Sequence, residues 1–382
     1  MRKEIKKPET DYEVLIVGGG LAGLTAAIHL SRYRISTVVI EKNAYPKHKV
    51  CGEYVSNEVL PYLNWLGIDP LELGAKKIDR FLLSTQNKQV ESKLPLGGFG
   101  LSRYVFDYSL AEKARAQGVL IKEYTVTDIQ FEKDYFRVIT NSGQSMTARI
   151  VIGAYGKRAA LDTKMNREFI SHASPYLAVK THLKGDFPDD LVALHNFKGG
   201  YCGLSKVEDG SINACYITDF ESFKKFRDIN EFQEHVLFKN PNLKTVFENC
   251  EPRFQKPLTI SQISFENKNP VEQHILMCGD TAGLIHPLCG NGMSMAIRSA
   301  QLVSQGILAY FRGEVSSREA LEINYEQAWN KEFKVRLKTG RIIASLFRHY
   351  GFSAWMLNIL KRFPKALPKI ITLTHGKPMK AE

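Results

Sequence analysis

The hydrophobic positions along this chain fall into short apolar runs separated by polar turns, and the first run is the clearest. Residues 12–17 have the sequence Tyr-Glu-Val-Leu-Ile-Val, which predicts a buried parallel strand. A helix-compatible stretch over residues 24–31 follows, and residues 36–40 (Ser-Thr-Val-Val-Ile) predict a second strand. A strand, a helix and a strand in this order form a βαβ unit, so the N-terminal part predicts an α/β domain with a parallel sheet.

Weaker patterns fill the region up to about residue 160. Residues 57–66 are typical of a helix, and a second helix begins near Arg103 and ends near Gly118. Runs rich in β-branched and aromatic residues predict strands at residues 81–85, 89–94, 119–124, 126–132, 135–140 and 145–152. Turns are predicted at residues 95–100 and at Asn141-Ser142-Gly143.

The pattern changes character between about residues 162 and 265. A helical block at residues 220–238 follows a group of predicted strands, which favours a second domain built on a mostly antiparallel sheet. The predicted strands lie at residues 176–183, 191–197 and 211–218. After them, residues 275–278 predict a short buried strand, residues 292–311 a long helix, and the chain beyond Tyr325 is helical.

The turn between the first predicted strand and helix carries the first chemical signal. It has the spacing Gly18-x-Gly20-x-x-Gly23, and Glu41 comes directly after the second predicted strand. Gly18 permits the tight turn, Gly20 lets the backbone approach a pyrophosphate, and Gly23 lets the helix pack close to the strand. The helix N-terminus offers N–H groups to phosphates, and Glu41 can accept hydrogen bonds from a ribose. This arrangement predicts a dinucleotide-binding site.

Composition narrows the class of protein. The 382 residues, 44% hydrophobic and 24% charged, are enough for two domains of an ordinary globular protein. No apolar stretch approaches the roughly 20 residues that span a bilayer, and residues 1–8 show no signal-peptide pattern. The six cysteines form no C-x-x-C pair and no metal-binding spacing, which predicts a reduced cytoplasmic protein without a metal site.

The net charge of +12 is concentrated at the C-terminal end. Residues 330–382 hold twelve Lys and Arg against Glu332 and Glu382, which accounts for +10 of the total. The segment 352–364 mixes Trp, Phe and Leu with Lys and Arg, so it suits a helix at the surface of an anionic membrane. Helices that cap the fold with a solvated basic face explain the pattern equally well. Nucleic acid is not expected as a partner, because no recognised binding module accompanies the charge.

A second glycine-rich segment follows the predicted strand at residues 275–278. Gly279-Asp280 comes directly after this strand, and a loop from Pro287 to Gly292 then opens the long helix. Together with the first motif, this Gly-Asp motif resembles that of the flavoproteins that include aromatic hydroxylases, geranylgeranyl reductases and flavin halogenases. The resemblance extends over about residues 11–311 and implies a bound FAD. In such proteins the aspartate binds the ribitol of FAD, and the loop faces the isoalloxazine.

The resemblance also implies a division of the chain. An α/β, Rossmann-like and discontinuous FAD-binding domain is expected from residues 1–75, 100–160 and 266–325. Residues 76–99 and 161–265 are expected to form a mostly antiparallel α+β substrate domain. Residues 326–382 form the basic, helical C-terminal region.

Several residues are assigned to FAD by the same resemblance. Arg103 matches a position at which arginine contacts the cofactor, Val126 matches one whose backbone contacts adenine, and the loop with Cys51 and Gly52 matches one that lies near the flavin. The implied contacts are Gly18, Gly20, Leu21, Ala22, Gly23, Glu41, Lys42, Cys51, Gly52, Arg103, Val126, Gly279, Asp280, Pro287, Gly290, Asn291, Gly292 and Met293.

Two departures from the family pattern bear on the reaction. Tyr155-Gly156 stands where hydroxylases carry Asp-Gly, a motif that helps to organise the FAD and NADPH sites. Tyr201 lies in a Gly-Tyr-Cys-Gly-Leu-Ser segment that lacks the Trp, Phe and Pro of the Tyr-x-Trp-x-Phe-Pro motif of geranylgeranyl reductases. The Trp-x-Trp-x-Ile-Pro signature of halogenases is absent, so halogenation is not expected.

The resemblance implies an FAD-dependent oxidoreductase that acts on an apolar, lipid or isoprenoid-like substrate. Reduced flavin would deliver a hydride to a C=C bond, and Cys51 and Tyr201 are the candidate proton donors. The alternatives are a monooxygenase that hydroxylates an aromatic or polyketide-type substrate, and a flavin redox carrier without catalysis. Only one Gly-x-Gly-x-x-Gly unit is present, so the expected reductant is a transiently bound NAD(P)H or a protein electron donor.

Overall fold

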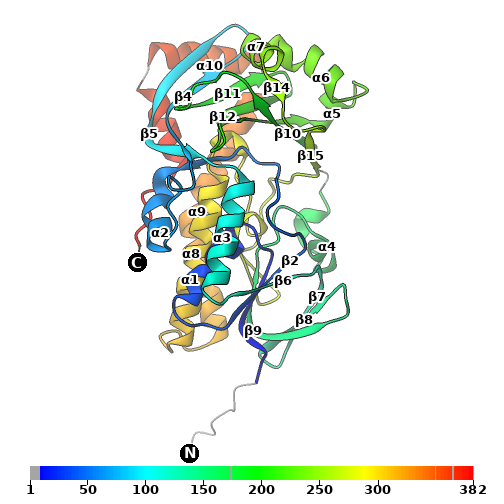
Figure 1. The fold of residues 1–382 in the computed structure, drawn as a ribbon, viewed down its shortest axis with the longest axis vertical. Helices are drawn as coiled ribbons and strands as arrows, with labels where there is room; N and C mark the ends of the chain where they lie inside the picture. The colour runs from blue at the N-terminus through cyan, green and yellow to red at the C-terminus, as the bar shows by residue number, and fades with distance from the viewer. Residues whose placement is uncertain (1–8, 173, 349, 364, 382) are drawn as a thin grey trace, which may run out of the picture.

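The computed structural model describes residues 9–172, 174–348, 350–363 and 365–381. Two β-sheets lie toward opposite ends of the molecule, and long helices run along its longest axis (Figure 1). Residues 1–8, whose composition argued against a signal peptide, lie outside the described residues, as do the side chains of residues 346–354. The protein has a mixed α/β fold with a helical C-terminal part, as the sequence predicted.

The first sheet contains the parallel strands that the N-terminal pattern predicted. Its strand order is β16-β17-β9-β1-β2-β6, in which β1 pairs in parallel with β2 and with β9. The hairpin of β7 and β8 extends the sheet beside β9. A central parallel strand is covered on both faces, which is why β1 is almost continuously apolar. The strands are β1 (Tyr12–Val17), β2 (Thr37–Glu41), β6 (Leu120–Glu123), β7 (Val126–Glu132), β8 (Tyr135–Thr140), β9 (Ser145–Gly153), β16 (Val271–Glu272) and β17 (Ile275–Met277).

Long helices form the core of the molecule with this sheet. Helix α1 packs against α3 and α8, and α8 packs against α9. Helix α8 has the bounds that the sequence predicted. The helices are α1 (Leu21–Ser31), α3 (Arg103–Ala116), α8 (Gly292–Phe311) and α9 (Arg318–Arg348).

The second sheet is mostly antiparallel, as predicted. Its strand order is β14-β10-β13-β12-β11-β4-β5-β3, with β15 also paired to β10, and β11 runs parallel to β4. The strands are β3 (Tyr54–Ser56), β4 (Lys76–Ser84), β5 (Gln89–Gly100), β10 (Tyr176–Lys184), β11 (Leu191–Phe197), β12 (Gly200–Lys206), β13 (Ile212–Asp219), β14 (Glu251–Pro252) and β15 (Leu258–Ser261).

Three local predictions were wrong. Residues 95–100 continue strand β5 instead of forming a turn, and a Cβ on Gly100 would come within 1.9 Å of the Lys206 carbonyl oxygen. Glycine therefore marks a close approach of two backbones here, not a loop. Strand β12 was not predicted, because its glycines and small residues weaken the alternation. The block 220–238 is broken into separate helices, because Asp228 caps the start of a second one.

The shorter helices are distributed over both sheets, and α4 packs against β7 of the first sheet. Helix α2 covers less of residues 57–66 than predicted, because a 3₁₀ turn precedes it and Pro61 stands in its first turn. The shorter helices are α2 (Leu60–Trp65), α4 (Ala160–Lys164), α5 (Phe220–Phe223), α6 (Ile229–His235), α7 (Pro241–Asn249), α10 (Tyr350–Arg362) and α11 (Ala366–Thr374).

The C-terminal region is part of the folded body. Leu357, Leu360 and Leu367 of α10 and α11 are buried in one cluster with residues of β4 and β5. Beyond α11, the chain returns to the first half, where the Met379 N–H donates a hydrogen bond to the Glu58 carbonyl oxygen at 2.8 Å. No helix among the described residues is long and apolar enough to cross a bilayer.

Candidate active site

A cavity of about 1230 Å³ lies between the two sheets and brings together most of the predicted site residues. Gly18, Gly23 and Val126 are not among the residues that line it, and Val126 is a buried residue at the start of β7. Cavity residues from the prediction are Gly20, Leu21, Ala22, Glu41, Lys42, Cys51, Gly52, Arg103, Tyr201, Gly279, Asp280, Pro287, Gly290, Asn291, Gly292 and Met293.

The three glycines of the first motif differ in the room beside them. Gly18 has a φ of +106°, and a Cβ there would lie 2.4 Å from the Ala154 carbonyl oxygen. A Cβ on Gly23 would lie 2.0 Å from the Gly18 carbonyl oxygen, so helix and strand are packed as closely as their backbones allow. A Cβ on Gly20 would meet no atom closer than 3.6 Å, so the backbone there can be approached by a phosphate.

The floor of this turn is fixed by an acidic and an aromatic side chain. Glu41 is buried at the end of β2, and its carboxylate accepts the Gly19 N–H at 2.8 Å. The Tyr45 hydroxyl donates to the Gly19 carbonyl oxygen at 2.5 Å. The two peptide units that flank Gly19 are therefore both held, one through its N–H and the other through its carbonyl oxygen. Tyr45 was not identified from the sequence, because nothing in its local pattern links it to the glycines.

Two cations face the open side of Gly20. The nearest atoms to a Cβ built there are Arg103 Nη2 at 3.6 Å and Lys49 Nζ at 3.8 Å. Asp107 holds both cations, by two bonds to Arg103 of 2.7 and 2.8 Å and by one ion pair to Lys49 of 2.8 Å. Burial opposes ionisation of Asp107, but Arg103 and Lys49 keep its pKa below the ordinary value. The cations are thus positioned where a pyrophosphate would lie against the glycine turn.

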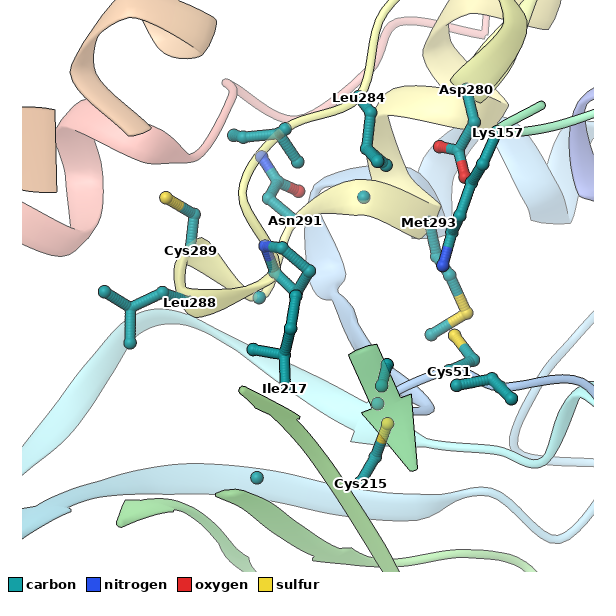
Figure 2. A pocket seen from close by; sticks show the side chains of 18 of the residues that line it. Cys51, Lys157, Cys215, Ile217, Asp280, Leu284, Leu288, Cys289, Asn291 and Met293 are labelled. Atoms are coloured by element: carbon teal, nitrogen blue, oxygen red, sulfur yellow. The ribbon is translucent and has the colours of Figure 1, made fainter. Parts of the chain in front are cut away.

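The second motif reaches the same cavity from the first sheet. Gly279, with a φ of +63°, follows β17, and its missing Cβ leaves room for Ala22 of α1. Asp280 and Lys157 lie side by side at the cavity wall (Figure 2). The Lys268 ammonium donates to the carbonyl oxygens of Lys157 and Asp280, at 2.7 and 2.9 Å, which fixes both backbones. Asp280 lines the cavity, and its role in binding the ribitol stays a prediction.

Tyr155 and Gly156, which stand where hydroxylases carry Asp-Gly, also lie at this wall. The Gly156 N–H donates to the Thr281 hydroxyl at 2.9 Å, and Tyr155 packs with the core of the first sheet. Burial, and then the nearby Asp162, raise the pKa of the Tyr155 hydroxyl well above its ordinary value. Tyr155 therefore places an uncharged aromatic side chain at the position where hydroxylases carry the charged aspartate of their Asp-Gly motif.

Cys51 lies on a loop between the two sheets, close to Met293 and Cys215 (Figure 2). Its side chain interacts with the Arg103 guanidinium, and its carbonyl oxygen accepts the Asn213 side-chain N–H at 3.2 Å. The six cysteines are free thiols in the structure. The loop that carries Cys51 is thus held by Arg103 of α3 and by Asn213 of β13 in the second sheet.

A buried ion pair anchors this loop and was not found from the sequence. Glu53 and Lys180 have fully buried side chains and are directly paired. His182 lies 2.8 Å from the other carboxylate oxygen of Glu53, and Lys180 also donates to the Lys49 carbonyl oxygen at 3.1 Å. Burial alone would raise the pKa of Glu53, but Lys180 and then His182 hold it below the ordinary value of 4.5. Lys180 therefore connects strand β10 of the second sheet to the loop beside the cofactor groove.

The rest of the cavity is bounded by apolar side chains of the second sheet and of the C-terminal helices. We call this part the apolar lobe; its walls include Phe81, Leu83, Leu94, Val192, Leu194, Ile217, Met356, Leu360, Leu367, Ile370 and Ile371. Tyr201 of β12 lines the same cavity, 7% exposed, and its hydroxyl has no hydrogen-bond partner among the described residues. The loop from Pro287 to Asn291 faces the lobe with Leu288 and Cys289 (Figure 2).

These features define a flavin site: an open glycine turn with two cations, an acidic residue for a ribose, and a second acidic residue beside a helix N-terminus. The residues fit FAD because a Cβ built on Gly20 would meet only the cationic ends of Arg103 and Lys49 within 4 Å, which are suited to a pyrophosphate. The chain matches the family model of the FAD binding domain over residues 11–327 and belongs to this family of FAD-dependent oxidoreductases.

Known relatives cover most of the chain. It is similar to digeranylgeranylglycerophospholipid reductase of Methanosarcina acetivorans, with 25% identity over 84% of this chain and 81% of the relative. It is also similar to tryptophan 2-halogenase of Chondromyces crocatus, with 22% identity over 89% of this chain and 67% of the relative. Among solved structures, the flavin-dependent brominase Bmp2 shares the fold, with a TM-score of 0.78 at 17% identity over 97% of this chain and 96% of the other.

Proposed function

We propose that this FAD-dependent oxidoreductase reduces a C=C bond of an apolar, lipid or isoprenoid-like substrate. The observation that carries the proposal is the continuity of the cavity from the groove beside Gly20 to the apolar lobe. Bound and reduced FAD supplies a hydride to one alkene carbon, and the protein supplies a proton to the other. An apolar chain in the lobe would lie with one end at the flavin-facing loop.

The protein's own groups have separate tasks in this reaction. Arg103 and Lys49 would neutralise the pyrophosphate of bound FAD, and Asp280 would hold its ribitol. Burial raises the pKa of the Tyr201 hydroxyl well above its ordinary value, so this group stays protonated. Tyr201 and Cys51 are the candidate proton donors for the alkene carbon, and the two electrons come from NAD(P)H or a protein donor.

Anaerobic turnover with a defined probe tests the reaction. The enzyme is reduced with dithionite, mixed with geranylgeraniol without oxygen, and the product is analysed by mass spectrometry. We expect reoxidation of the flavin together with a product that has gained two hydrogens. Reoxidation only in air, with a product that has gained one oxygen, would instead support the alternative, a monooxygenase acting in the same cavity. A parallel titration with NADPH and NADH, followed by bleaching of the flavin band, identifies the reductant.

We also propose that the C-terminal helices rest on an anionic membrane surface. Trp355, Phe363 and Leu373 are 56%, 59% and 60% exposed, which is unusual for large apolar side chains. Cations lie on the same two helices and the turn between them, and they are exposed: Lys361, Arg362, Lys365 and Lys369. Because α10 and α11 also bound the apolar lobe, a lipid could pass between membrane and cavity without crossing water.

A further inference from the structure

A group of buried polar atoms without partners lies where the apolar lobe meets the flavin-facing loop. Among the described residues, the Tyr54 hydroxyl, Asn291 Oδ1 and His375 Nε2 have no hydrogen-bond partner. All three residues line the cavity, and Tyr54 and Asn291 are 8% and 0% exposed. We call these three residues the polar recess. Buried polar atoms are rarely left unpaired in native proteins, so each such atom here marks a place for a ligand atom.

Two members of the polar recess, Tyr54 and Asn291, share one neighbour, the buried carboxyl group of Glu58, and the third, His375, precedes a residue that bonds to it. Tyr54 and Asn291 both interact with this carboxyl group, and the Gly376 N–H, next to His375, donates to it. The ring of Tyr54 is held between Gly98 and Gly290, because a Cβ on either glycine would contact it. The recess is therefore built from three distant parts of the chain and is fixed in shape.

The hydrogen bonds that the three side chains already make determine what they can still do. His375 Nδ1 lies 2.9 Å from the Ile371 carbonyl oxygen, so Nδ1 carries the proton and Nε2 is left as an acceptor. The Asn291 side-chain N–H donates to the Thr374 carbonyl oxygen at 2.7 Å, which leaves Oδ1 as a second acceptor. The Tyr54 hydroxyl is the donor. One donor and two acceptors match a group that both accepts and donates a hydrogen bond.

The charges around the recess select against anions. Glu58 is its nearest carboxyl group, and the Arg336 guanidinium, 3.7 Å from Glu58, is also paired with Glu332. A phosphate or carboxylate would meet two acceptors there, and the nearest cation, Arg336, is already shared between Glu58 and Glu332, with only its Nη1 left without a hydrogen-bond partner among the described residues. We propose that the polar recess binds the hydroxyl group of a neutral and otherwise apolar substrate. This inference rests on the proposed function and adds the class of the substrate's polar end.

Binding of three matched probes to the FAD-loaded enzyme tests the proposal. Geranylgeraniol can accept and donate, geranylgeranyl methyl ether can only accept, and geranylgeranyl phosphate is an anion. Their dissociation constants are measured at one detergent concentration from the shift of the flavin absorption band. We expect the alcohol to bind about tenfold more tightly than the ether, since the ether leaves an acceptor of the recess unpaired. The phosphate should bind most weakly.

Two substitutions assign the effect to the recess. Tyr54→Phe should weaken the alcohol and the ether alike by about tenfold, because both accept from the hydroxyl. His375→Phe should reduce the difference between the dissociation constants of the alcohol and the ether, which we call the gap, because it removes an acceptor for the alcohol's proton. Tyr201→Phe, which changes a hydroxyl on the second sheet, should leave the gap unchanged. Flavin content and melting temperature are measured for each variant as controls for folding.

The possible results separate the two proposals. Equal binding of alcohol and ether overturns the recess but leaves the apolar substrate in place. A loss of bound flavin in Tyr54→Phe also overturns the recess, since its free polar atoms would then serve the cofactor. Equal affinities for alcohol and ether in Tyr201→Phe overturn it as well, since the hydroxyl group of the substrate would then be bound by Tyr201. Failure of all three probes to bind overturns the apolar substrate and the recess together.

Discussion

The two halves of the cavity are built in different ways. The glycine turn of the cofactor half relies on local sequence, because the turn, the start of α1 and Glu41 all come from one stretch of 24 residues, Gly18 to Glu41. The substrate half is assembled from β4, β5, the strands from β10 to β13, and the C-terminal helices. A backbone that must approach a pyrophosphate needs small residues at fixed spacing. A pocket for an apolar chain needs only apolar surface, which many distant segments can supply.

The loop between residues 49 and 53 joins the two halves. Its Lys49 faces the glycine turn, its Cys51 lines the cavity, and its Glu53 is held by Lys180 of the second sheet. If this pair holds the halves together, removal of one partner should affect both the stability of the fold and the cofactor groove.

The largest effect is expected from Lys180→Met. This change leaves Glu53 charged and buried without its main partner, which costs about 3–5 kcal/mol of unfolding free energy. The measurement is urea denaturation of the FAD-loaded protein, with flavin release recorded in parallel. The matched control is Lys184→Met on the same strand, an exposed position where a change within about 0.5 kcal/mol is expected. A loss for Lys180→Met no larger than for the control would show that the pair does not join the halves.

The double variant Glu53→Gln with Lys180→Met sharpens this result and predicts a pH dependence. Neutralising both partners removes the buried unpaired charge, so most of the lost stability should return. In the wild type the pKa of Glu53 is lowered from 4.5, so the unfolded chain takes up the proton first. The pair's contribution is then complete above about pH 4.5 and is lost as pH falls through the lowered pKa of the folded state. The double variant should lack this acid-dependent loss.

A smaller and more local effect is expected from Asp280→Ala in the cofactor half. The change removes a charged acceptor for the ribitol hydroxyls, which weakens FAD binding by about 1.5–3 kcal/mol, or roughly ten- to a hundredfold. Flavin fluorescence titration of the apoprotein measures the affinity, and circular dichroism shows that the fold is kept. Asp79→Ala, an exposed carboxylate on β4, is the control. Normal FAD affinity in Asp280→Ala would mean that another group binds the ribitol.

The contrast between a site built from one local stretch and a site assembled from distant segments explains how much could be predicted from the sequence. Gly18, Gly20, Gly23 and the bounds of α8 were predicted, because their constraints act within a few residues. The Glu53–Lys180 pair was not predicted, because its partners are 127 residues apart and each looks like an ordinary surface residue in its own segment. The polar recess was missed for the same reason: Tyr54 and His375 line one cavity because the chain beyond α11 returns to Glu58. Side-chain pairing across a tertiary fold leaves no local periodicity.

The basic C-terminal segment, residues 330–382, shows how a local pattern and tertiary packing combine in one region. Its helices were predicted, and one of the two interpretations, helices that cap the fold, describes their buried face, since Phe333, Leu337 and Met379 all belong to the main core. Removing the chain after Tyr325 would therefore expose the core and could not test membrane binding by itself. Single exposed cations on α10 and α11 give a cleaner test, because they leave the buried leucines in place.

The smallest effect is expected from Arg362→Ala and Lys369→Ala at the surface of the substrate half. Each removes one cation near an anionic bilayer, which is worth about 1 kcal/mol, or roughly fivefold in partitioning. Co-sedimentation with phosphatidylserine-containing vesicles measures the loss, and neutral phosphatidylcholine vesicles and added salt should weaken the wild type in the same direction. Lys164→Ala on α4 of the cofactor half, an exposed position, should behave like the wild type. If Lys164→Ala loses as much binding as the helix variants, the protein binds lipid through its overall charge. The proposal that α10 and α11 form the membrane-binding surface would then be wrong.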